Sequence, residues 1–177
     1  MKNLIYPILM VLAVLTQSCD TDIPETDTTP PEFTFRITGD GFEHVFNPTD
    51  DYNSIQLNLK SGAEYDFIYV GSDDGGVKLI QWQVPNQDYI EFISTIPDPW
   101  TAADVSALSR MIQWSGNPNN PITGNILSGT FETNGELVSL SFRFYVSDFG
   151  GESGSSNSVS KELTIYIGDH DTEIIEF

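Results

Sequence analysis

The sequence predicts an all-β fold in which two antiparallel β-sheets pack face to face as a sandwich. The first observation is a period-two alternation between residues 138 and 146, where an apolar side chain stands at every second position. The second is the return of this alternation at Leu163, Ile165 and Ile167, after a turn-forming run of Ser, Asp and Gly at 147–154. A lone hairpin is only marginally stable in water, so upstream strands must supply a second sheet to cover its apolar face.

The composition is the third observation, and it predicts one domain with one core. Of the 177 residues, 39% are hydrophobic and 12% are aromatic, which is enough for a sizeable core without disulfides. The 7 Lys and Arg residues against 26 Asp and Glu residues give a formal charge of −19. Nucleic acids and anionic lipid surfaces bind clustered basic residues, so this balance excludes both kinds of surface as partners.

Residues 1–18 have the pattern of a signal peptide. Lys2 gives a positively charged start, residues 4–15 are almost wholly apolar, and the small residue Ser18 stands where processing would occur. The apolar run is shorter than the roughly 20 residues of a membrane-spanning helix. Because Cys19 closes this segment, the pattern resembles a bacterial lipoprotein signal, which implies a lipidated Cys19 and an anchor in the outer membrane. The alternative is an ordinary secretory signal with an incidental cysteine.

Residues 19–32 are expected to form an acidic, mobile tether, because they are rich in Thr, Pro and acid and have almost no apolar side chains to bury. Asp20 and Asp22 resemble the export signal of surface lipoproteins in the Bacteroidota, which implies display at the cell surface. The chain departs from the lipoprotein pattern at Thr16, where leucine is usual. The alternative for the acidic start is a merely soluble linker.

The sandwich is predicted to span residues 33–168. Alternation and turn signals predict its upstream strands at 33–38, 42–46, 55–60, 65–70, 77–84 and 126–132. The pair Asn134-Gly135 predicts a hairpin turn into the strand that begins near residue 138. The acidic residues 169–177 are expected to form a frayed tail.

Two of these strands, at 65–70 and 77–84, resemble the B and C strands of immunoglobulin-like sandwiches. Trp82 stands at the middle of the second one, where a C-strand Trp fills the core of such domains. With Pro30-Pro31 before the first strand and the run 146–151 before the last, the pattern resembles the immunoglobulin-like or cadherin-like modules of secreted bacterial proteins. The resemblance implies an immunoglobulin-like antiparallel β-sandwich and no particular function.

Between residues 97 and 121 the period changes, and a short helical insertion is predicted. Thr101 with Asp104 matches a capping box, and Val105, Leu108 and Ile112 would share one helix face.

Trp100 and Trp114 flank this insertion and are candidate ligand-binding residues. An aromatic ring there could stack on a sugar or anchor a protein partner. The alternative is that both tryptophans only fix the insertion onto the sandwich.

Asp73, Asp74 and Asp148 stand in loops that adjoin if the immunoglobulin-like arrangement holds. Carboxylate oxygens from several loops are the hard ligands that calcium takes, so these residues form a candidate calcium site. The spacing of an EF-hand is absent. The alternative is that Asp and Gly only build turns here.

Catalytic motifs are missing from the sequence. His44 and His170 are the only histidines, and neither lies in a recognisable nucleophile motif. A zinc site would need more His or Cys, and the glycine pair at 75–76 joins two strands and does not precede a helix. A glycosidase needs two carboxylates at a fixed separation, but 26 acidic residues offer too many pairs for one to be singled out.

We therefore expect a non-catalytic, lipid-anchored binding module of the cell envelope that recognises a glycan or a protein. No cofactor is expected apart from the calcium that the three aspartates would bind. Two alternatives stay open: a small carboxylate-dependent hydrolase, and a structural envelope component that pairs through an edge strand.

Overall fold

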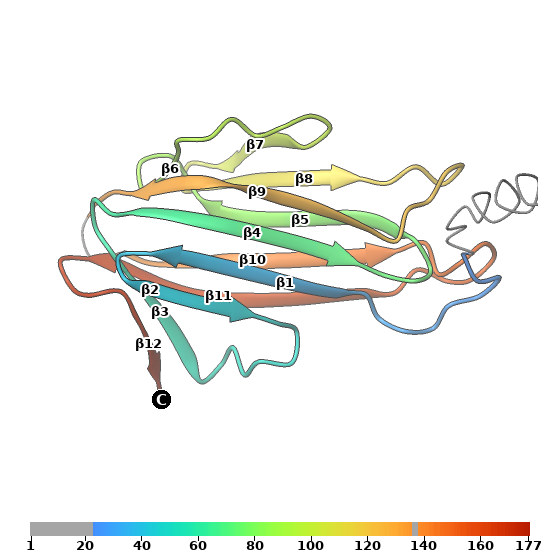
Figure 1. Cartoon of the computed structure of the whole chain (residues 1–177), viewed down its shortest axis with the longest axis horizontal. Coiled ribbons are helices and arrows are strands. Elements are labelled where there is room, and N and C mark those ends of the chain that lie inside the picture. The colour runs from blue at the N-terminus through green and yellow to red at the C-terminus, as the bar shows by residue number, and fades with distance from the viewer. Residues whose placement is uncertain (1–22, 136–137) are drawn as a thin grey trace, which may run out of the picture.

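The computed structural model describes residues 23–135 and 138–177, and within these ranges it contains strands and no helix (Figure 1). The strands are β1 (Glu32–Gly39), β2 (Phe42–Phe46), β3 (Ile55–Lys60), β4 (Glu64–Ser72), β5 (Val77–Pro85), β6 (Ile90–Phe92), β7 (Thr101–Ser106), β8 (Ser109–Ser115), β9 (Gly124–Thr133), β10 (Val138–Asp148), β11 (Ser158–Gly168) and β12 (Glu173–Glu176). The all-β prediction is confirmed.

The strands form two sheets that face each other, as predicted. Sheet A has the order β2-β1-β4-β9-β6, and sheet B has the order β12-β3-β11-β10-β5-β8-β7. Neighbouring strands are antiparallel except β3, which runs parallel to β11. The predicted C-terminal hairpin is β10–β11, in which Leu140 lies opposite Ile165 and Phe142 lies opposite Leu163.

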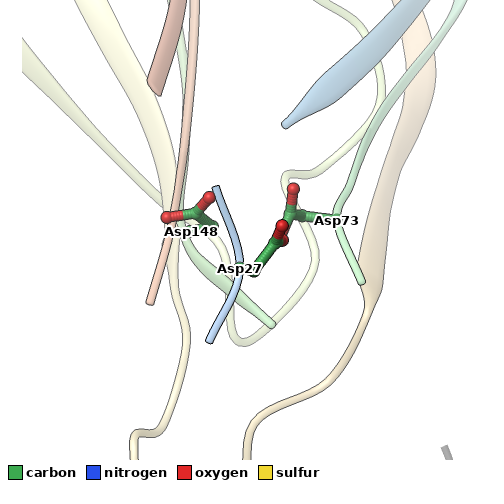
Figure 2. Close-up of side chains that lie close together, drawn as sticks. All are labelled: Asp27, Asp73 and Asp148. Atoms are coloured by element: carbon green, nitrogen blue, oxygen red, sulfur yellow. The ribbon is translucent and has the colours of Figure 1, made fainter. Parts of the chain in front are cut away.

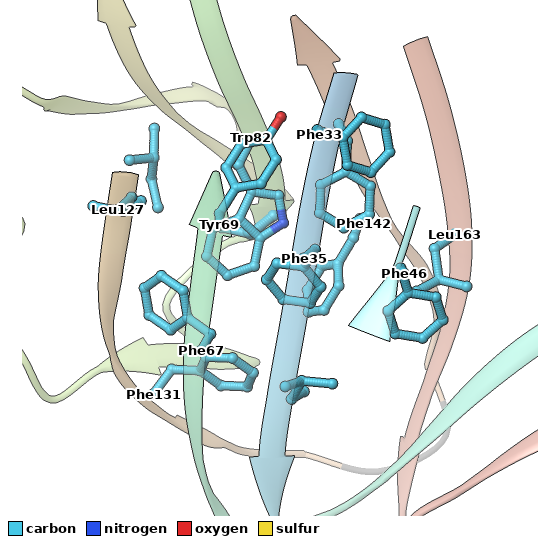
Figure 3. Packing of buried hydrophobic residues seen from close by; sticks show 14 of the residues in the cluster. Phe33, Phe35, Phe46, Phe67, Tyr69, Trp82, Leu127, Phe131, Phe142 and Leu163 are labelled. Carbon is cyan, nitrogen blue, oxygen red and sulfur yellow. The ribbon is translucent and has the colours of Figure 1, made fainter. Parts of the chain in front are cut away.

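Aromatic side chains from both sheets fill the space between them (Figure 3). Phe35 of sheet A lies with its ring centroid 5.0 Å from Trp82 and 4.9 Å from Phe144, both of sheet B. Trp82 also meets Phe142 edge to face at 5.2 Å, and none of these four side chains has measurable exposure. Each such side chain stabilises the fold by about 1.5–3 kcal/mol through burial alone. The predicted core position of Trp82 is confirmed.

The predicted helical insertion is wrong, because residues 101–115 form the hairpin β7–β8 at the edge of sheet B. The burial at the end of β8 has period two: Ile112 and Trp114 are buried, whereas Met111 and Gln113 are partly exposed and Ser115 is exposed. Backbone pairing decides the outcome, since β8 continues sheet B by pairing antiparallel with β5. Val105 and Leu108, which were expected on a buried helix face, are 53% and 59% exposed near the hairpin turn.

Two further expectations change in detail. The pair Asn134-Gly135 does not close a hairpin, because β9 belongs to sheet A and β10 belongs to sheet B. The C-terminal tail contains β12, which pairs with β3, and the amide of Phe177 donates a hydrogen bond to the carbonyl of Ser54 at 2.9 Å.

Part of the predicted tether contacts the sandwich, because residues 24–27 are hydrogen-bonded to the loop that follows β10. The amide of Glu152 donates to the carbonyl of Pro24 at 3.0 Å, and the amide of Asp27 donates to the carbonyl of Gly150 at 2.8 Å. The predicted signal peptide at 1–18, Cys19 and the acidic residues Asp20 and Asp22 lie outside the described residues. Within the described ranges no helix is long and apolar enough to cross a membrane.

Candidate metal site

Three segments meet at one end of the sandwich: residues 24–29, the β4–β5 loop at 73–76, and the loop after β10 at 149–157. Backbone hydrogen bonds join the two loops, since the amide of Gly151 donates to the carbonyl of Gly75 at 3.1 Å. The N-terminal segment adds to this pair through the bonds to Gly150 and Glu152 described above. Residues far apart in the sequence are thereby fixed side by side.

The first two segments and the end of β10 each contribute one aspartate to a cluster that we call the aspartate cluster: Asp27, Asp73 and Asp148 (Figure 2). One carboxylate oxygen from each residue lies within 4.8 Å of the others. Asp148 is fully buried and Asp73 is 8% exposed, while Asp27 is partly buried. Glycosidase carboxylates are set about 5–9 Å apart to flank a sugar bond, so this closer spacing suits a shared cation or proton better.

Hydrogen bonds satisfy most of the oxygens of the aspartate cluster. Asp148 accepts from the backbone and side-chain amides of Asn157 at 2.5 and 2.9 Å. Asp73 Oδ1 accepts from the amide of Gly75 at 2.7 Å, and Asp27 Oδ1 accepts from the amide of Thr29 at 2.9 Å. Asp27 Oδ2 has less than 1 Å² of accessible surface and no hydrogen-bond partner among the described residues. Besides Thr29, a protonated Asp73 side chain and the amide of Gly75 nevertheless lie close enough to the Asp27 carboxylate to lower its pKa.

Within the described residues, no ion pair joins a cationic side chain to the aspartate cluster. Burial raises the pKa of Asp73 to about 7, with the amide of Gly75 lowering it and the charges of Asp148 and Asp27 raising it. Hydrogen bonds from Thr29 lower the pKa of Asp27. Within residues 23–135 and 138–177, the ion pairs join other residues: Arg36–Glu43, Lys60–Asp40, Arg110–Asp104 and Arg143–Glu162. A proton or a bound cation must supply the missing positive charge.

A glycine makes room for the aspartate cluster. A Cβ added to Gly75 would lie 2.6 Å from Asp27 Oδ2 and 2.9 Å from Asp73 Oδ1, which is closer than side chains approach each other. Beside the cluster is a hollow of about 480 Å³ that includes Thr29, Ser72, Asp73 and Asp74 in its lining. Solvent or an ion can therefore approach Asp73 from outside.

The structure brings together two of the three predicted calcium ligands. Asp73 and Asp148 belong to the aspartate cluster, whereas Asp74 is exposed and lines only the hollow. Asp27 is the third member of the aspartate cluster, although it was expected to belong to a mobile tether. These three residues fit a calcium ion, which takes six to eight oxygen ligands and accepts carboxylates together with water or backbone oxygens.

The other candidate ligand-binding residues do not form a site. Trp100 is 4% exposed and Trp114 is 6% exposed, so neither presents a ring face to a sugar or a protein partner. Both contribute to the core, and Trp114 lies opposite Ile80 in the β5–β8 pair. Their burial favours the alternative, in which the two tryptophans fix this segment onto the sandwich.

No protein-family model and no curated protein matches this chain. Two solved structures that resemble it are cohesin modules. One is the cohesin module of a family 33 glycoside hydrolase from Clostridium perfringens, with 12% identity, a TM-score of 0.38, and coverage of 64% of this chain and 96% of that one. The other is a non-cellulosomal cohesin from the hyperthermophilic archaeon Archaeoglobus fulgidus, with 14% identity, a TM-score of 0.33, and coverage of 64% and 91%. At these TM-scores we draw no conclusion from the likeness.

Proposed function

We propose that this chain is a non-catalytic recognition module of the bacterial cell envelope whose N-terminal segment is fixed to the sandwich by calcium. The observation that carries the calcium assignment is the aspartate cluster with its unpartnered Asp27 Oδ2. A cation there would neutralise three carboxylates at once and would give that oxygen a partner. Because Asp27 comes from the segment before β1, the ion would join the start of the chain to the loops at 73–76 and 149–157.

Calcium binding can be tested by thermal unfolding and isothermal titration calorimetry at pH 7.5. We expect calcium to raise the Tm of the wild type and chelator to lower it. Asp73→Asn should remove most of the response, since it deletes a charged ligand. Asp74→Asn is the matched control, because it makes the same change next to Asp73 on an exposed side chain. A Tm that does not respond to calcium, or equal responses in the two variants, would contradict the assignment and leave a shared proton as the account of the cluster.

The immunoglobulin-like class is part of this proposal, and the strand order supports it. In sheet A the order β1-β4-β9-β6 corresponds to the A-B-E-D order of such domains. In sheet B the order β11-β10-β5-β8-β7 corresponds to G-F-C-C′-C″. The chain departs from this class between β5 and β9, because β6 precedes β7 and β8 in the sequence and because β7, in the C″ place, precedes β8, in the C′ place. The strands β2, β3 and β12 are additional to this correspondence.

Envelope attachment rests on the N-terminal sequence pattern. We propose that Cys19 carries the lipid that anchors the protein in the outer membrane, with Asp20 and Asp22 directing it to the cell surface, as the Bacteroidota lipoprotein pattern implies. Cys19→Ala should move the protein from the membrane fraction to the soluble fraction. Continued membrane association of this variant, or an unmodified thiol in the mature wild-type chain by mass spectrometry, would refute lipidation.

A further inference from the structure

A groove of about 620 Å³ is lined by residues of β2, β3 and β12 and of the loop between β2 and β3. The strands β2 and β12 are edge strands of the two sheets and lie on the same side of the sandwich (Figure 1). Its apolar lining comes from Phe42 of β2, Ile55 of β3, Ile174 of β12 and the C-terminal Phe177. Phe177 is 78% exposed, the largest exposed fraction among the big apolar side chains of the described residues. We call this feature the edge groove.

The edge groove forms where the side chains between the two sheets are only partly buried. Along β2 the inward-facing positions are Phe42, His44 and Phe46, and only Phe46 is fully buried. On the opposite side Leu57 is fully buried, while Ile55 on the same strand is partly exposed. Burial lowers the pKa of His44, which keeps its ring neutral near neutral pH and the lining of the groove weakly polar.

Both strands that border the edge groove have a free edge. Within the described ranges β2 pairs only with β1, and β12 pairs only with β3. Their outer backbone amides and carbonyls are therefore open to an added strand. An extended peptide can pair with such an edge and place every second side chain in the groove.

The negative charge around the edge groove determines which kind of partner can bind there. The rim carries Asp50, Asp51 and Glu176, and no Lys or Arg belongs to the lining of the edge groove. The formal charge of −19 opposes docking of a second copy of this chain on the same surface. A partner that complements both the apolar lining and the acidic rim must combine apolar and basic side chains.

We propose that the edge groove binds an extended segment of a partner protein in which apolar side chains alternate with Lys or Arg. This inference rests on the proposed function as a recognition module and makes its partner a protein. It is independent of the aspartate cluster, whose residues do not line the groove.

The test is fluorescence anisotropy with a labelled peptide of alternating lysine and leucine at physiological salt. A peptide with glutamate in place of lysine and one with serine in place of leucine should each bind at least about tenfold more weakly, since each lacks one half of the complementarity. Equal binding of the serine peptide would show attraction by net charge alone and would overturn the proposal. Absence of binding by the lysine–leucine peptide would overturn it too.

Two variants of β12 locate the binding site. Glu176→Lys should weaken the lysine–leucine peptide about fivefold, because it reverses a charge of the rim. Glu173→Lys is the matched control, since Glu173 is exposed on the same strand and does not line the groove. Equal effects of the two variants would contradict the assignment. Both variants should keep the calcium response. Loss of peptide binding with retained calcium binding would therefore count against the edge groove alone. Loss of calcium binding with retained peptide binding would count against the calcium site alone.

Discussion

Carboxylates gather in the aspartate cluster and in the edge groove, and the surroundings of these two groups differ. In the aspartate cluster, Asp27, Asp73 and Asp148 converge within 4.8 Å and receive most of their hydrogen bonds from loop amides. In the edge groove, Asp50, Asp51 and Glu176 stand around an apolar lining. The aspartate cluster concentrates negative charge in a small volume, whereas the edge groove distributes negative charge around an apolar surface.

Carboxylate groups therefore select different ligands in these two surroundings. Converging buried carboxylates need a compact cation or a proton, since no larger group fits among oxygens so close together. Separated carboxylates on an apolar rim suit a larger partner with both basic and apolar groups. Substitutions in the aspartate cluster should therefore affect stability and calcium binding, whereas substitutions in the edge groove should affect peptide binding.

The pH dependence of stability should separate the aspartate cluster from the rest of the protein. The pKa of Asp73 rises from 3.8 to about 7 on folding, so its charged form is disfavoured in the folded state. Without calcium, the wild type should lose stability relative to Asp73→Asn as the pH rises from 4 to 8, by up to about 3 kcal/mol once solvent screening of this partly accessible carboxyl group is allowed for. The lowered pKa of Asp27 acts in the opposite direction and only at lower pH.

Urea unfolding at several pH values measures this difference. Calcium should remove most of it at pH 8, because the cation replaces the proton as the counter-charge. A constant difference between wild type and Asp73→Asn across this pH range would mean that Asp73 titrates normally and that the aspartate cluster is open to water.

Asp148→Ala should have the next largest effect, a loss of about 3 kcal/mol in the free energy of unfolding. The substitution leaves the backbone and side-chain amides of Asn157, a partly buried residue, without their acceptor. Asp74→Ala is the control, and its cost should stay within about 0.5 kcal/mol because Asp74 is exposed. Similar costs for the two changes would show that Asp148 does not organise the loops.

Gly75→Ala should cost about 1–2 kcal/mol and abolish the calcium response, because the new methyl group would displace the carboxylates of Asp27 and Asp73. Gly41→Ala provides the comparison. Gly41 lies in the β1–β2 turn with a φ of 75°, and a Cβ there has open space around it. That variant should lose stability through its backbone conformation while it keeps its response to calcium, and equal calcium responses in the two variants would argue against the crowding at Gly75.

Most strands could be predicted because their signal is local. Alternation along β10 and β11 identifies the buried face without any knowledge of the partner strands, and Trp82 follows from the same pattern. The helical prediction at 101–112 failed for a related reason. Val105, Leu108 and Ile112 have helical spacing by coincidence. The pairing of β8 is determined by β5, whose other edge is already paired with β10.

The aspartate cluster could be predicted only in part, because its residues come from three distant segments. The turn-rich loops indicated Asp73 and Asp148, since both follow strands of a recognisable sandwich. Asp27 gave no such signal. Its place depends on backbone bonds between residues 24–27 and the loop at 150–153, and the sequence around Asp27 has only the composition of a linker.

The smallest effect is expected at the edge groove, where Glu176→Gln should change the free energy of unfolding by less than about 0.5 kcal/mol. Glu176 is exposed and takes part in none of the ion pairs found within the described ranges. Removal of its charge therefore releases no buried partner, in contrast to Asp148→Ala. The calcium response should be unchanged, and binding of the lysine–leucine peptide should weaken by less than it does in Glu176→Lys.

This combination of results distinguishes a charge that serves binding from one that serves folding. Glu173→Gln, on the same strand but outside the groove lining, should change neither stability nor peptide binding. If Glu176→Gln instead destabilised the protein as much as Asp148→Ala does, the rim of the edge groove would be part of the folded framework. The contrast between the two groups of carboxylates would then disappear, because both would be required to hold neighbouring segments together.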